Sequence, residues 1–517
     1  MRSTFMGLET SKRGLYTQQS ALYTTGHNVA NANTEGYSRQ RVNMEATLGY
    51  PGIGLQSPTT PGNIGTGVQA SSIQRMRDQF TDRQYRQETN RLGYWEATSK
   101  SIAQMEDVMS EPSEYGINQS FTDFWESMQD VINQPKDAAS RQVFLSKGEA
   151  LAESFNYMDT QLKLIQGNFG NELNVSTKEV NSILKQIASL NEQIQAVEPN
   201  GYLPNDLYDA RDVLIDQLNE YLPVSISTVT SGGNALAIAE GSVTVTLNGI
   251  TLVDGNKYVK LQAQDTDALE ITGEEPLTPF QQFGFSELKK ATAHEADEKN
   301  DQVTYNAETL NYSDLEPFKG KLISIIDSFG FDDGNGKAGG LYTDVIGQLN
   351  ELVSTFVKEF NAVHKAGYGL DGSTGVAFFD ETGLTAATIK MAITSTDQVA
   401  ASTKLGEVGN NENINNLAKL NETTWPTIKN GTFQSYYASI IGDVAVKGQE
   451  ANRMEYNSVT LRLQIENNRA SMTSVSLDEE MTNMITFQQA YNANARMVTV
   501  VDECLEKIIN GMGRVGI

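Results

Sequence analysis

Residues 474–511 read SVSLDEEMTNMITFQQAYNANARMVTVVDECLEKIING. Apolar side chains recur there at every seventh position, at Met484, Tyr491, Val498, Leu505 and, just beyond, Met512. A seven-residue apolar repeat predicts a helix with one apolar stripe, the pattern of helices that wind around one another. Because such a helix is only marginally stable alone in water, we expect this stripe to pack against a partner helix.

The N-terminal end of the chain carries a matching stripe. Leu8, Leu15, Leu22 and Val29 are also spaced at seven, which predicts a helix of about 30 residues. The simplest arrangement pairs the first helix with the last, and the pair then packs against neighbouring subunits. The alternative that the spacing leaves open is that both helices belong to one intramolecular bundle.

The stretch NVANANTEGYSRQR at residues 28–41 predicts the end of the first helix. Asn31, Asn33 and Gly36 are residue types that tolerate left-handed backbone and stop helices. The chain therefore turns here, directly before a stretch rich in glycine and proline.

The interior begins with a long run without proline. From Asp137 to Val197 apolar residues recur in steps of three and four, which predicts a helical segment about 90 Å long if it is unbroken. Gly167 and Gly170 flank a skip in this pattern, so we expect the helix to loosen or bend there. Further helices are predicted at 93–109, 118–133, 206–222, 345–363 and 432–474. These lengths indicate an elongated molecule.

Between Pro223 and Phe331 apolar and polar residues alternate instead. The segments VSISTVT, SVTVTLNGITLV and KYVKLQA predict strands, and Asn248-Gly249 marks a tight turn. An antiparallel β domain is therefore expected as an insertion that projects from a helical shaft. A small mixed region follows at 367–429.

Composition and charge exclude several classes of protein. The chain has 517 residues, so we expect several modules, and no run reaches the 18 or more apolar residues of a membrane span. The N-terminus lacks the apolar region of a secretory signal. A net charge of −26 argues against nucleic acid or an anionic membrane as the main partner. Residues 1–92 hold ten Lys and Arg against six acids, which indicates either an ordinary solvated surface or complementarity to acidic parts of another copy.

No catalytic, cofactor or metal site can be named. The single cysteine, Cys504, is expected to be a buried small apolar residue, and the histidines His27, His294 and His364 lie far apart in sequence. GNIGTG at 62–67 lacks the Lys-Ser/Thr ending of a phosphate loop, and DDGNGKAGG at 332–340 places Lys337 where a calcium loop needs an oxygen ligand. The sequence therefore predicts neither an enzyme nor a cofactor.

Several segments resemble bacterial flagellar proteins. NVANANTEGYSRQ at 28–40 and SLDEEMTNMITFQQAYNANARMVTVVDECLEKIIN at 476–510 are similar to the paired terminal motifs of flagellar axial proteins. PNDLYDARDVLIDQLNEYLPVSIS at 204–227, LNELVSTFVKEFNAVHKAGYGLDGSTG at 349–375 and FFD at 378–380 resemble the flagellar hook-associated protein 1 family. The resemblance covers both ends and most of the shaft, and it is weakest in the β region.

This resemblance implies a mainly α fold with inserted β, elongated and multi-domain, in which the terminal helices pair as a coiled coil. The implied parts are the inner coiled-coil domain with its elbow loop (1–60 and 475–517), the helical shaft (61–223 and 332–474) and the outer β domain (224–331). The elbow positions implied by the family motif are Asn31, Asn33, Gly36, Tyr37, Arg39 and Arg41. The two arginines would offer charge to an adjacent subunit.

The function implied is structural, because members of this family form the junction between hook and filament by helical self-assembly. The implied partners are further copies of the chain, the hook protein, the next hook-associated junction protein and a cytoplasmic export chaperone at the C-terminal segment. The implied location is the extracellular flagellum, reached through the flagellar export apparatus without a cleaved signal peptide. Alternatives are a hook or rod protein, which would be richer in β structure, and a surface enzyme or adhesin carried by the β insertion.

Overall fold

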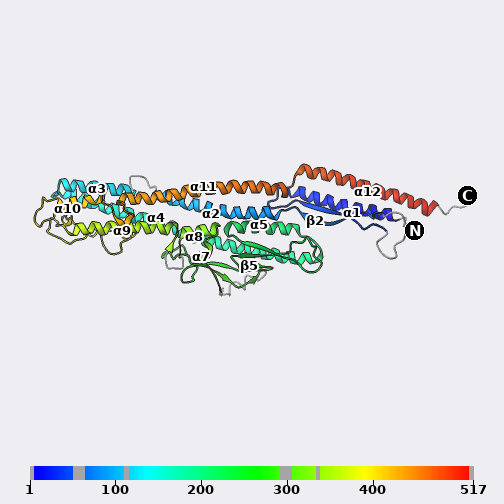
Figure 1. Cartoon of the computed structure of the whole chain (residues 1–517), viewed down its shortest axis with the longest axis horizontal. Helices are drawn as coiled ribbons and strands as arrows, with labels where there is room; N and C mark the ends of the chain where they lie inside the picture. The colour runs from blue at the N-terminus through cyan, green and yellow to red at the C-terminus, as the bar shows by residue number, and fades with distance from the viewer. Residues whose placement is uncertain (1–4, 51–63, 110–115, 292–304, 333–337, 512–517) are drawn as a thin grey trace.

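The computed structural model describes residues 5–50, 64–109, 116–291, 305–332 and 338–511, and it is long and narrow with both ends of the chain on one side (Figure 1). The helices are α1 (Met6–Ala30), α2 (Gln79–Met109), α3 (Ile117–Asn133), α4 (Ala138–Val197), α5 (Asn205–Tyr221), α7 (Tyr312–Leu315), α8 (Lys321–Phe329), α9 (Leu341–Lys365), α10 (Glu412–Ala418), α11 (Phe433–Thr473) and α12 (Leu477–Gly511). The strands are β1 (Gln40–Ala46), β2 (Val68–Arg75), β3 (Ser225–Val229), β4 (Ser242–Leu247), β5 (Ile250–Asp254), β6 (Lys257–Tyr258), β7 (Leu261–Gln264), β8 (Gln282–Ser286), β9 (Lys289–Lys290), β10 (Tyr305–Asn311), β11 (Phe331–Asp332) and β12 (Ala338–Gly339).

The first and last helices lie side by side at one end of the molecule, as the sequence predicts (Figure 1). Gly7 of α1 faces Val501 of α12, near the free end of both helices. At the other end of the pair the Asn28 side chain donates a hydrogen bond to Glu480. The two helices therefore run antiparallel, and we call them the terminal pair.

A β-hairpin that the sequence analysis did not predict follows the elbow. Strands β1 and β2 pair antiparallel, from Gln40 opposite Arg75 to Ala46 opposite Val68. Both strands pack on α1, where the Thr17 hydroxyl donates to the Val68 carbonyl at 3.2 Å. The domain boundary expected at residue 60 lies outside the described residues, between β1 and β2.

The shaft is a bundle of α2, α3, α4, α5, α8, α9 and α11. Helix α4 runs without interruption through 60 residues, which confirms the predicted long segment. Asp137 caps its start by accepting a hydrogen bond from the Ser140 backbone N–H. Helix α11 begins with a capping box between Thr432 and Ser435 and packs along α2. These caps explain why both helices start where the sequence predicts.

Two glycines inside α4 have a different role from the one expected. The helix continues through Gly167 and Gly170, although the skip in the apolar pattern predicted a weak point. A Cβ at Gly167 would lie 2.6 Å from the Gly273 carbonyl oxygen, and one at Gly170 would lie 2.8 Å from the Phe329 ring. Glycine is therefore needed here because other parts of the chain approach the helix closely.

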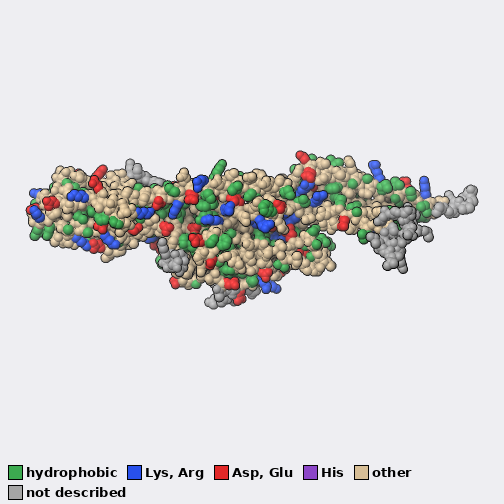
Figure 2. Space-filling model, viewed as in Figure 1, with side chains coloured by type: hydrophobic (Ala, Val, Ile, Leu, Met, Phe, Trp, Pro, Cys, Tyr) green, Lys and Arg blue, Asp and Glu red, His purple; other side chains and the backbone are tan. Residues whose placement is uncertain are grey.

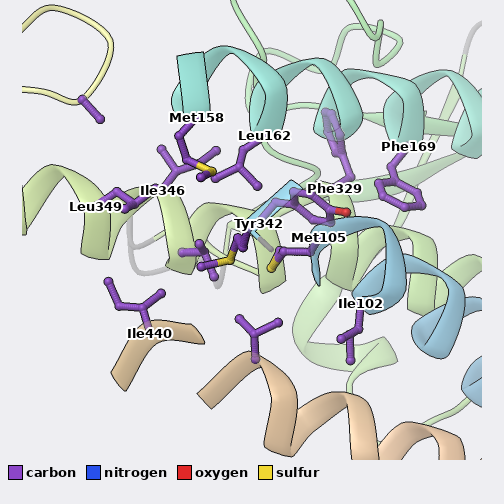
Figure 3. Close-up of a cluster of buried hydrophobic side chains, with 14 of the residues drawn as sticks. Ile102, Met105, Met158, Leu162, Phe169, Phe329, Tyr342, Ile346, Leu349 and Ile440 are labelled. Atoms are coloured by element: carbon purple, nitrogen blue, oxygen red, sulfur yellow. The ribbon is translucent and has the colours of Figure 1, made fainter. Parts of the chain in front are cut away.

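The core of the shaft joins helices that are far apart in sequence. Figure 3 shows apolar side chains from α2, α4, α8, α9 and α11 pointing toward one another. Met105, Leu162, Phe329 and Leu349 in this cluster are at most 1% exposed. Burial of each such side chain contributes about 1.5–3 kcal/mol, so this cluster fixes how the helices stack.

The β domain consists of two antiparallel sheets, with strand orders β3-β4-β5-β6-β9 and β10-β8-β7. This confirms the antiparallel β structure predicted between the helical segments. The domain also shares a core with the shaft, because its strands pack on α4 and the Asn181 side chain bonds both the amide and the carbonyl of Leu261. Helix α8, inside the region expected to be β, packs on α2 and α4. The β domain is therefore anchored along the shaft.

The end of the shaft that lies away from the chain termini (Figure 1) is held by aromatic rings and by a polar side chain of α9, His364. Phe124 and Phe360 lie 5.4 Å apart between ring centroids, within a larger aromatic cluster. His364 is buried, donates from Nδ1 to the Val376 carbonyl at 2.8 Å and accepts the Ala400 backbone N–H at Nε2. Burial lowers the pKa of His364 to about 4, so this imidazole is neutral at pH 7.

Candidate assembly surface and joint

Helix α1 packs on both α12 and the hairpin, and its buried side chains are small or polar rather than leucines. The buried positions of α1 are Ser11, Gly14, Thr17, Ala21, Thr24, Thr25 and Asn28. A Cβ at Gly14 would lie 2.8 Å from the Asn494 amide oxygen, so the two helices approach closely at this point.

The predicted heptad positions are only half-buried in the single chain. In α1 these are Leu8, Leu15, Leu22 and Val29, and in α12 they are Met484, Tyr491, Val498 and Leu505. Met512 lies outside the described residues. Within a single chain, the terminal pair therefore covers its predicted apolar stripes incompletely.

Helix α12 also exposes apolar side chains outside the heptad positions. These residues, each 42–71% exposed, are Leu477, Met481, Ile485, Met497, Val500, Ile508 and Ile509. Cys504 on the same helix is exposed too, so the burial expected for it is wrong. The signal for this set was present in the sequence as a four-residue spacing from Leu477 to Ile485. Exposed apolar surface of this extent on one helix is typical of an interaction site.

The elbow loop, residues 31–39, turns the chain by means of local hydrogen bonds. Asn31 ends α1, and its side chain donates back to the His27 carbonyl. Asn33 is exposed. Gly36 has a φ of 76°, in the left-handed region that favours glycine, and a Cβ there would overlap the Val213 side chain of α5. Three of the predicted elbow residues are therefore placed where the turn occurs.

Tyr37 and Arg39 attach the elbow to both terminal helices. The Tyr37 hydroxyl donates to the Asn28 side chain at 2.8 Å. Arg39 donates to Glu479 at 2.9 Å and to Glu480 at 2.8 Å, and these bonds raise its pKa. The positive charge of Arg39, which was expected to face an adjacent subunit, is thus paired with carboxylates of the same chain.

Arg41, the last predicted elbow position, has a different environment. It lies on β1, one residue past Gln40, and it is exposed. Its position leaves the guanidinium accessible from outside the chain.

A cluster of buried charges lies directly behind the elbow, where the terminal pair meets the shaft. The arginine cluster consists of Arg75, Arg77, Arg86, Arg211 and Arg469 with Asp82, Asp209, Asp212, Asp216 and Glu240. Asp212 of α5 is its centre, because it contacts Arg75 at 2.7 Å, Arg77 at 2.9 Å and Arg86 at 3.0 Å. The cluster therefore ties β2, α2, α5 and α11 together, and we call this region the joint.

The two central carboxylates of the joint respond differently to burial. Burial disfavours the charged form of Asp212, but the guanidinium groups of Arg77 and Arg75 outweigh it and hold its pKa well below the usual value. At Asp209 burial prevails over the contact with Arg75 and raises the pKa. The difference follows from the number of close arginines, since Asp212 has three within 3.0 Å.

The joint accounts for the basic excess of the N-terminal region. Arg39, Arg75, Arg77 and Arg86 all bind carboxylates of α2, α5 or α12, or Glu240, in the same chain. These four arginines therefore pair with carboxylates of their own chain, whereas the charge distribution had suggested pairing with another copy.

The described residues contain no group of three or more His, Cys, Asp or Glu side chains placed to hold a metal ion. His294, most of DDGNGKAGG and the first residues of GNIGTG lie outside the described residues. Among the helices that the structure describes, none is both long and apolar enough to span a membrane.

Comparisons with known families agree with this arrangement at both ends of the chain. Residues 8–37 match the flagella basal body rod protein domain, and residues 468–511 match the C-terminal region of the flagellar basal body rod FlgEFG proteins. Together with the exposed terminal helices, these matches define the class as an axial structural protein of the bacterial flagellum.

The shaft and the full-length relatives identify the family. Residues 102–379 match the flagellar hook-associated protein FlgK helical domain. Flagellar hook-associated protein 1 of Bacillus subtilis is 41% identical over 99% of both chains, and that of Salmonella typhimurium is 23% identical over 96% of this chain and 98% of its own. The flagellar hook junction protein FlgK from Burkholderia pseudomallei shares the fold, with a TM-score of 0.60 at 14% identity over 76% of this chain and all of its own.

The chain belongs to the flagellar hook-associated protein 1 (FlgK) family, which confirms the resemblance seen in the sequence. It is an axial structural component at the hook–filament junction, it assembles with other flagellar axial proteins, and it is part of the external flagellum. The relatives are named as structural proteins and not as enzymes, so the enzyme alternative is set aside. The hook and rod alternatives are set aside by the match to the FlgK shaft.

Proposed function

We propose that this chain forms the junction by packing its terminal pair against the terminal pairs of further copies around the flagellar axis. The observation that carries this proposal is the exposed apolar set of α12, which includes Met481 at 54% and Ile485 at 56% exposed in the single chain. Covering such side chains contributes about 25 cal/mol per Å² of apolar surface, which favours association. The assembly interface comprises this set, the half-buried positions Leu8, Leu15, Leu22, Val29, Met484, Tyr491, Val498 and Leu505, and Met512, which continues the heptad spacing.

The neighbours along the axis are the hook protein on one side and the next hook-associated junction protein on the other. Residues 1–60 and 475–517 form the inner part of the assembly, residues 61–223 and 332–474 form the surrounding shaft, and residues 224–331 face outward. The elbow positions from Asn31 to Tyr37 hold the turn between inner part and shaft, and Arg41 is available to an adjacent subunit because it is exposed.

Before assembly the same exposed apolar residues of α12 need a temporary cover. A cytoplasmic export chaperone binds this C-terminal segment, and the chain leaves through the flagellar export apparatus without cleavage of a signal peptide. The support for this step is the number of large apolar side chains that α12 exposes between Leu477 and Ile509.

The proposal is tested by Ile485→Asp in the full-length chain. An aspartate buried without a partner in each contact between copies opposes assembly by several kcal/mol, roughly, so we expect the variant to fail to cap isolated hooks. The matched control is Val446→Asp on α11, which is 66% exposed and lies among charged residues. Circular dichroism checks that both variants fold, and electron microscopy counts capped hooks and filaments grown from them. Normal capping by Ile485→Asp contradicts the proposal.

A further inference from the structure

Arg141, in the first turn of α4, is a buried cation. It is 1% exposed, and no carboxylate in the described parts of the chain forms an ion pair with it. Burial lowers the pKa of Arg141, and Asp397, which lies beyond ion-pair distance, only partly offsets this effect. In the joint, by contrast, Arg75 and Arg211 are also buried and both contact carboxylates of their own chain. Because an unpaired charge in the interior is costly, Arg141 is expected to have an anionic partner.

Backbone carbonyls hold the Arg141 guanidinium in place. Its Nε donates to the Pro135 carbonyl at 2.7 Å, and its Nη1 donates to the carbonyls of Thr396 and Val399 at 3.1 and 2.8 Å. An arginine has five N–H donors, so these three bonds leave the two on Nη2, which donate to no group in the described residues. Carbonyl oxygens also carry no net charge. The guanidinium is therefore fixed in position, with an unpaired positive charge and two N–H groups available.

Arg141 lines a cavity of about 230 Å³ at the end of the shaft that lies away from the chain termini. The other walls come from residues 368–372 and 402–410, in the loop between α9 and α10 (Figure 1). Two carboxylates lie at the exposed rim and are already bound, because Asp371 accepts the Ser373 backbone N–H and Glu407 pairs with Lys404 at 3.6 Å. The cavity therefore connects an exposed rim with a buried guanidinium.

The charge of the site favours a carboxylate over a phosphate group. A carboxylate carries one negative charge, which one guanidinium can balance through charge-assisted hydrogen bonds. A protein phosphate group carries about 1.5–2 negative charges at pH 7 and would be repelled by Asp371 and Glu407 at the rim. Lys404, the other cation among the lining residues, already pairs with Glu407. One carboxylate is therefore the anion that the cavity fits best.

Two apolar side chains lie beside the charged site. Leu405 is 68% exposed and Val408 43%, and both line the cavity. A Cβ at Gly372 would lie 3.5 Å from the Leu405 side chain, so the two loop segments meet at this rim. A central contact that is shielded from water by its neighbours is typical of the sites that dominate binding between polypeptides. A polypeptide can cover Leu405 and Val408, whereas a small free carboxylate leaves both exposed.

We propose that the cavity binds the carboxylate of an aspartate or glutamate side chain on a polypeptide that docks at this end of the shaft. The carboxylate accepts hydrogen bonds from Nη2 of Arg141, and the residues beside it pack on Leu405 and Val408. The site lies at the opposite end of the molecule from α12 (Figure 1). It is therefore a second interaction surface, separate from the one used in the proposed function.

The test is a nuclear magnetic resonance titration of the full-length chain as a dilute monomer with isotope-labelled glycine, because Gly369, Gly372 and Gly406 line the cavity. The probes, at constant ionic strength, are sodium acetate, inorganic phosphate, the peptide acetyl-Leu-Glu-Leu-amide and its glutamine counterpart. We expect the signals of these glycines to saturate with acetate, and with the glutamate peptide at a concentration at least fivefold lower. The glutamine peptide should not saturate them.

Each other outcome contradicts a part of the proposal. No saturation with either acetate or the glutamate peptide overturns the site. Saturation with the glutamine peptide at the same concentration as the glutamate peptide, or with phosphate at a lower concentration than acetate, overturns the carboxylate as ligand. If acetate binds as tightly as the glutamate peptide, the ligand is a small free carboxylate and the polypeptide source is wrong. Because the titration uses no hooks, its result does not depend on the capping assay for the proposed function.

Two sets of variants locate the binding. Arg141→Gln should raise the acetate concentration for half-saturation at least tenfold in a chain whose circular dichroism matches wild type. If this variant does not fold, Leu405→Glu replaces it, with Leu405→Gln as the matched control at the same exposed position. Leu405→Glu places a competing carboxylate beside the cavity, so we expect acetate to bind at least fivefold more weakly than to Leu405→Gln. Unchanged binding in a folded Arg141→Gln chain, or equal binding in the two Leu405 variants, overturns the inference.

Discussion

Replacing Asp212 with asparagine tests whether the joint depends on its central charge. Asparagine keeps the size of the side chain but removes the charge that faces Arg75, Arg77 and Arg86 at 2.7–3.0 Å. Breaking a buried ion pair by removing one partner typically costs about 3–5 kcal/mol. Each of the three arginines keeps at least one other carboxylate, such as Asp216 for Arg86. We therefore expect the lower end of this range, about 3 kcal/mol.

The assay is urea unfolding of the full-length chain at pH 7, followed by circular dichroism, with hydrogen exchange of β2 and α5 as a local readout. Asp443→Asn is the matched control, because Asp443 pairs with Lys429 at 3.3 Å while both side chains are about 60% exposed. An exposed pair of this kind contributes at most about 1 kcal/mol. If Asp212→Asn lowers the free energy of unfolding no more than the control, the reasoning about the joint is refuted.

The same substitution has a predicted pH signature. Because the pKa of Asp212 is lowered in the folded chain, its stabilisation is present above the ordinary carboxyl pKa of about 4 and is lost as pH falls toward the lower folded value. The raised pKa of Asp209 has the opposite effect, because this group makes the folded chain less stable as pH rises just above 4. The difference in unfolding free energy between wild type and Asp212→Asn should therefore shrink below pH 4, and a constant difference would contradict this account.

Two further substitutions test other parts of the fold. The pKa of His364 is about 4 in the folded chain and about 6.5 in the unfolded chain. The free energy of unfolding of the wild type should therefore fall by about 3 kcal/mol as pH falls from 6.5 to 4. We expect the urea midpoint of His364→Gln to depend less on pH than that of the His27→Gln control. Gly36→Ala places a Cβ against Val213 at a position with positive φ, so it should destabilise the elbow by about 1–3 kcal/mol. A Cβ at Gly26 has no neighbour within 4 Å, so Gly26→Ala should stabilise α1 by up to about 1 kcal/mol. Equal melting temperatures for the two alanine variants would contradict the assigned role of Gly36.

The helices predicted best were those whose ends and buried faces are determined by residues close together in the sequence. Helix α11 starts after Thr432 and ends before Ser474, as the sequence predicts, because a capping box fixes its start. Helix α4 was predicted over its full length because its buried side is mainly apolar, although Arg141, Asp159 and Asn191 are buried too. In both cases apolar periodicity and capping residues agree, so the sequence alone is sufficient.

The elements that were missed are held by polar contacts between distant segments. The first turns of α2, residues 79–92, bury Asp82, Glu88, Thr89 and Asn90, so no apolar stripe reveals them. The hairpin β1/β2 is mostly exposed and polar, and apolar alternation is therefore weak there. The arginine cluster could not be predicted either, because its members come from residues 75–86, 209–216, 240 and 469.

The chemistry of the joint suits a part whose geometry must be fixed. An apolar contact tolerates sliding, because the hydrophobic effect has no direction, whereas an arginine that bonds two carboxylates accepts few orientations. Buried ion pairs add little net stability compared with apolar packing, so stability alone does not explain why β2, α2, α5 and α11 meet through charges. We infer that the cluster sets the angle between the terminal pair and the shaft in each copy. If so, Asp212→Asn should spread that angle in single-particle images, while Asp443→Asn leaves it unchanged. If a folded Asp212→Asn chain keeps the angle unchanged, the inference is wrong and other contacts, such as that of Arg39 with Glu479, set the angle.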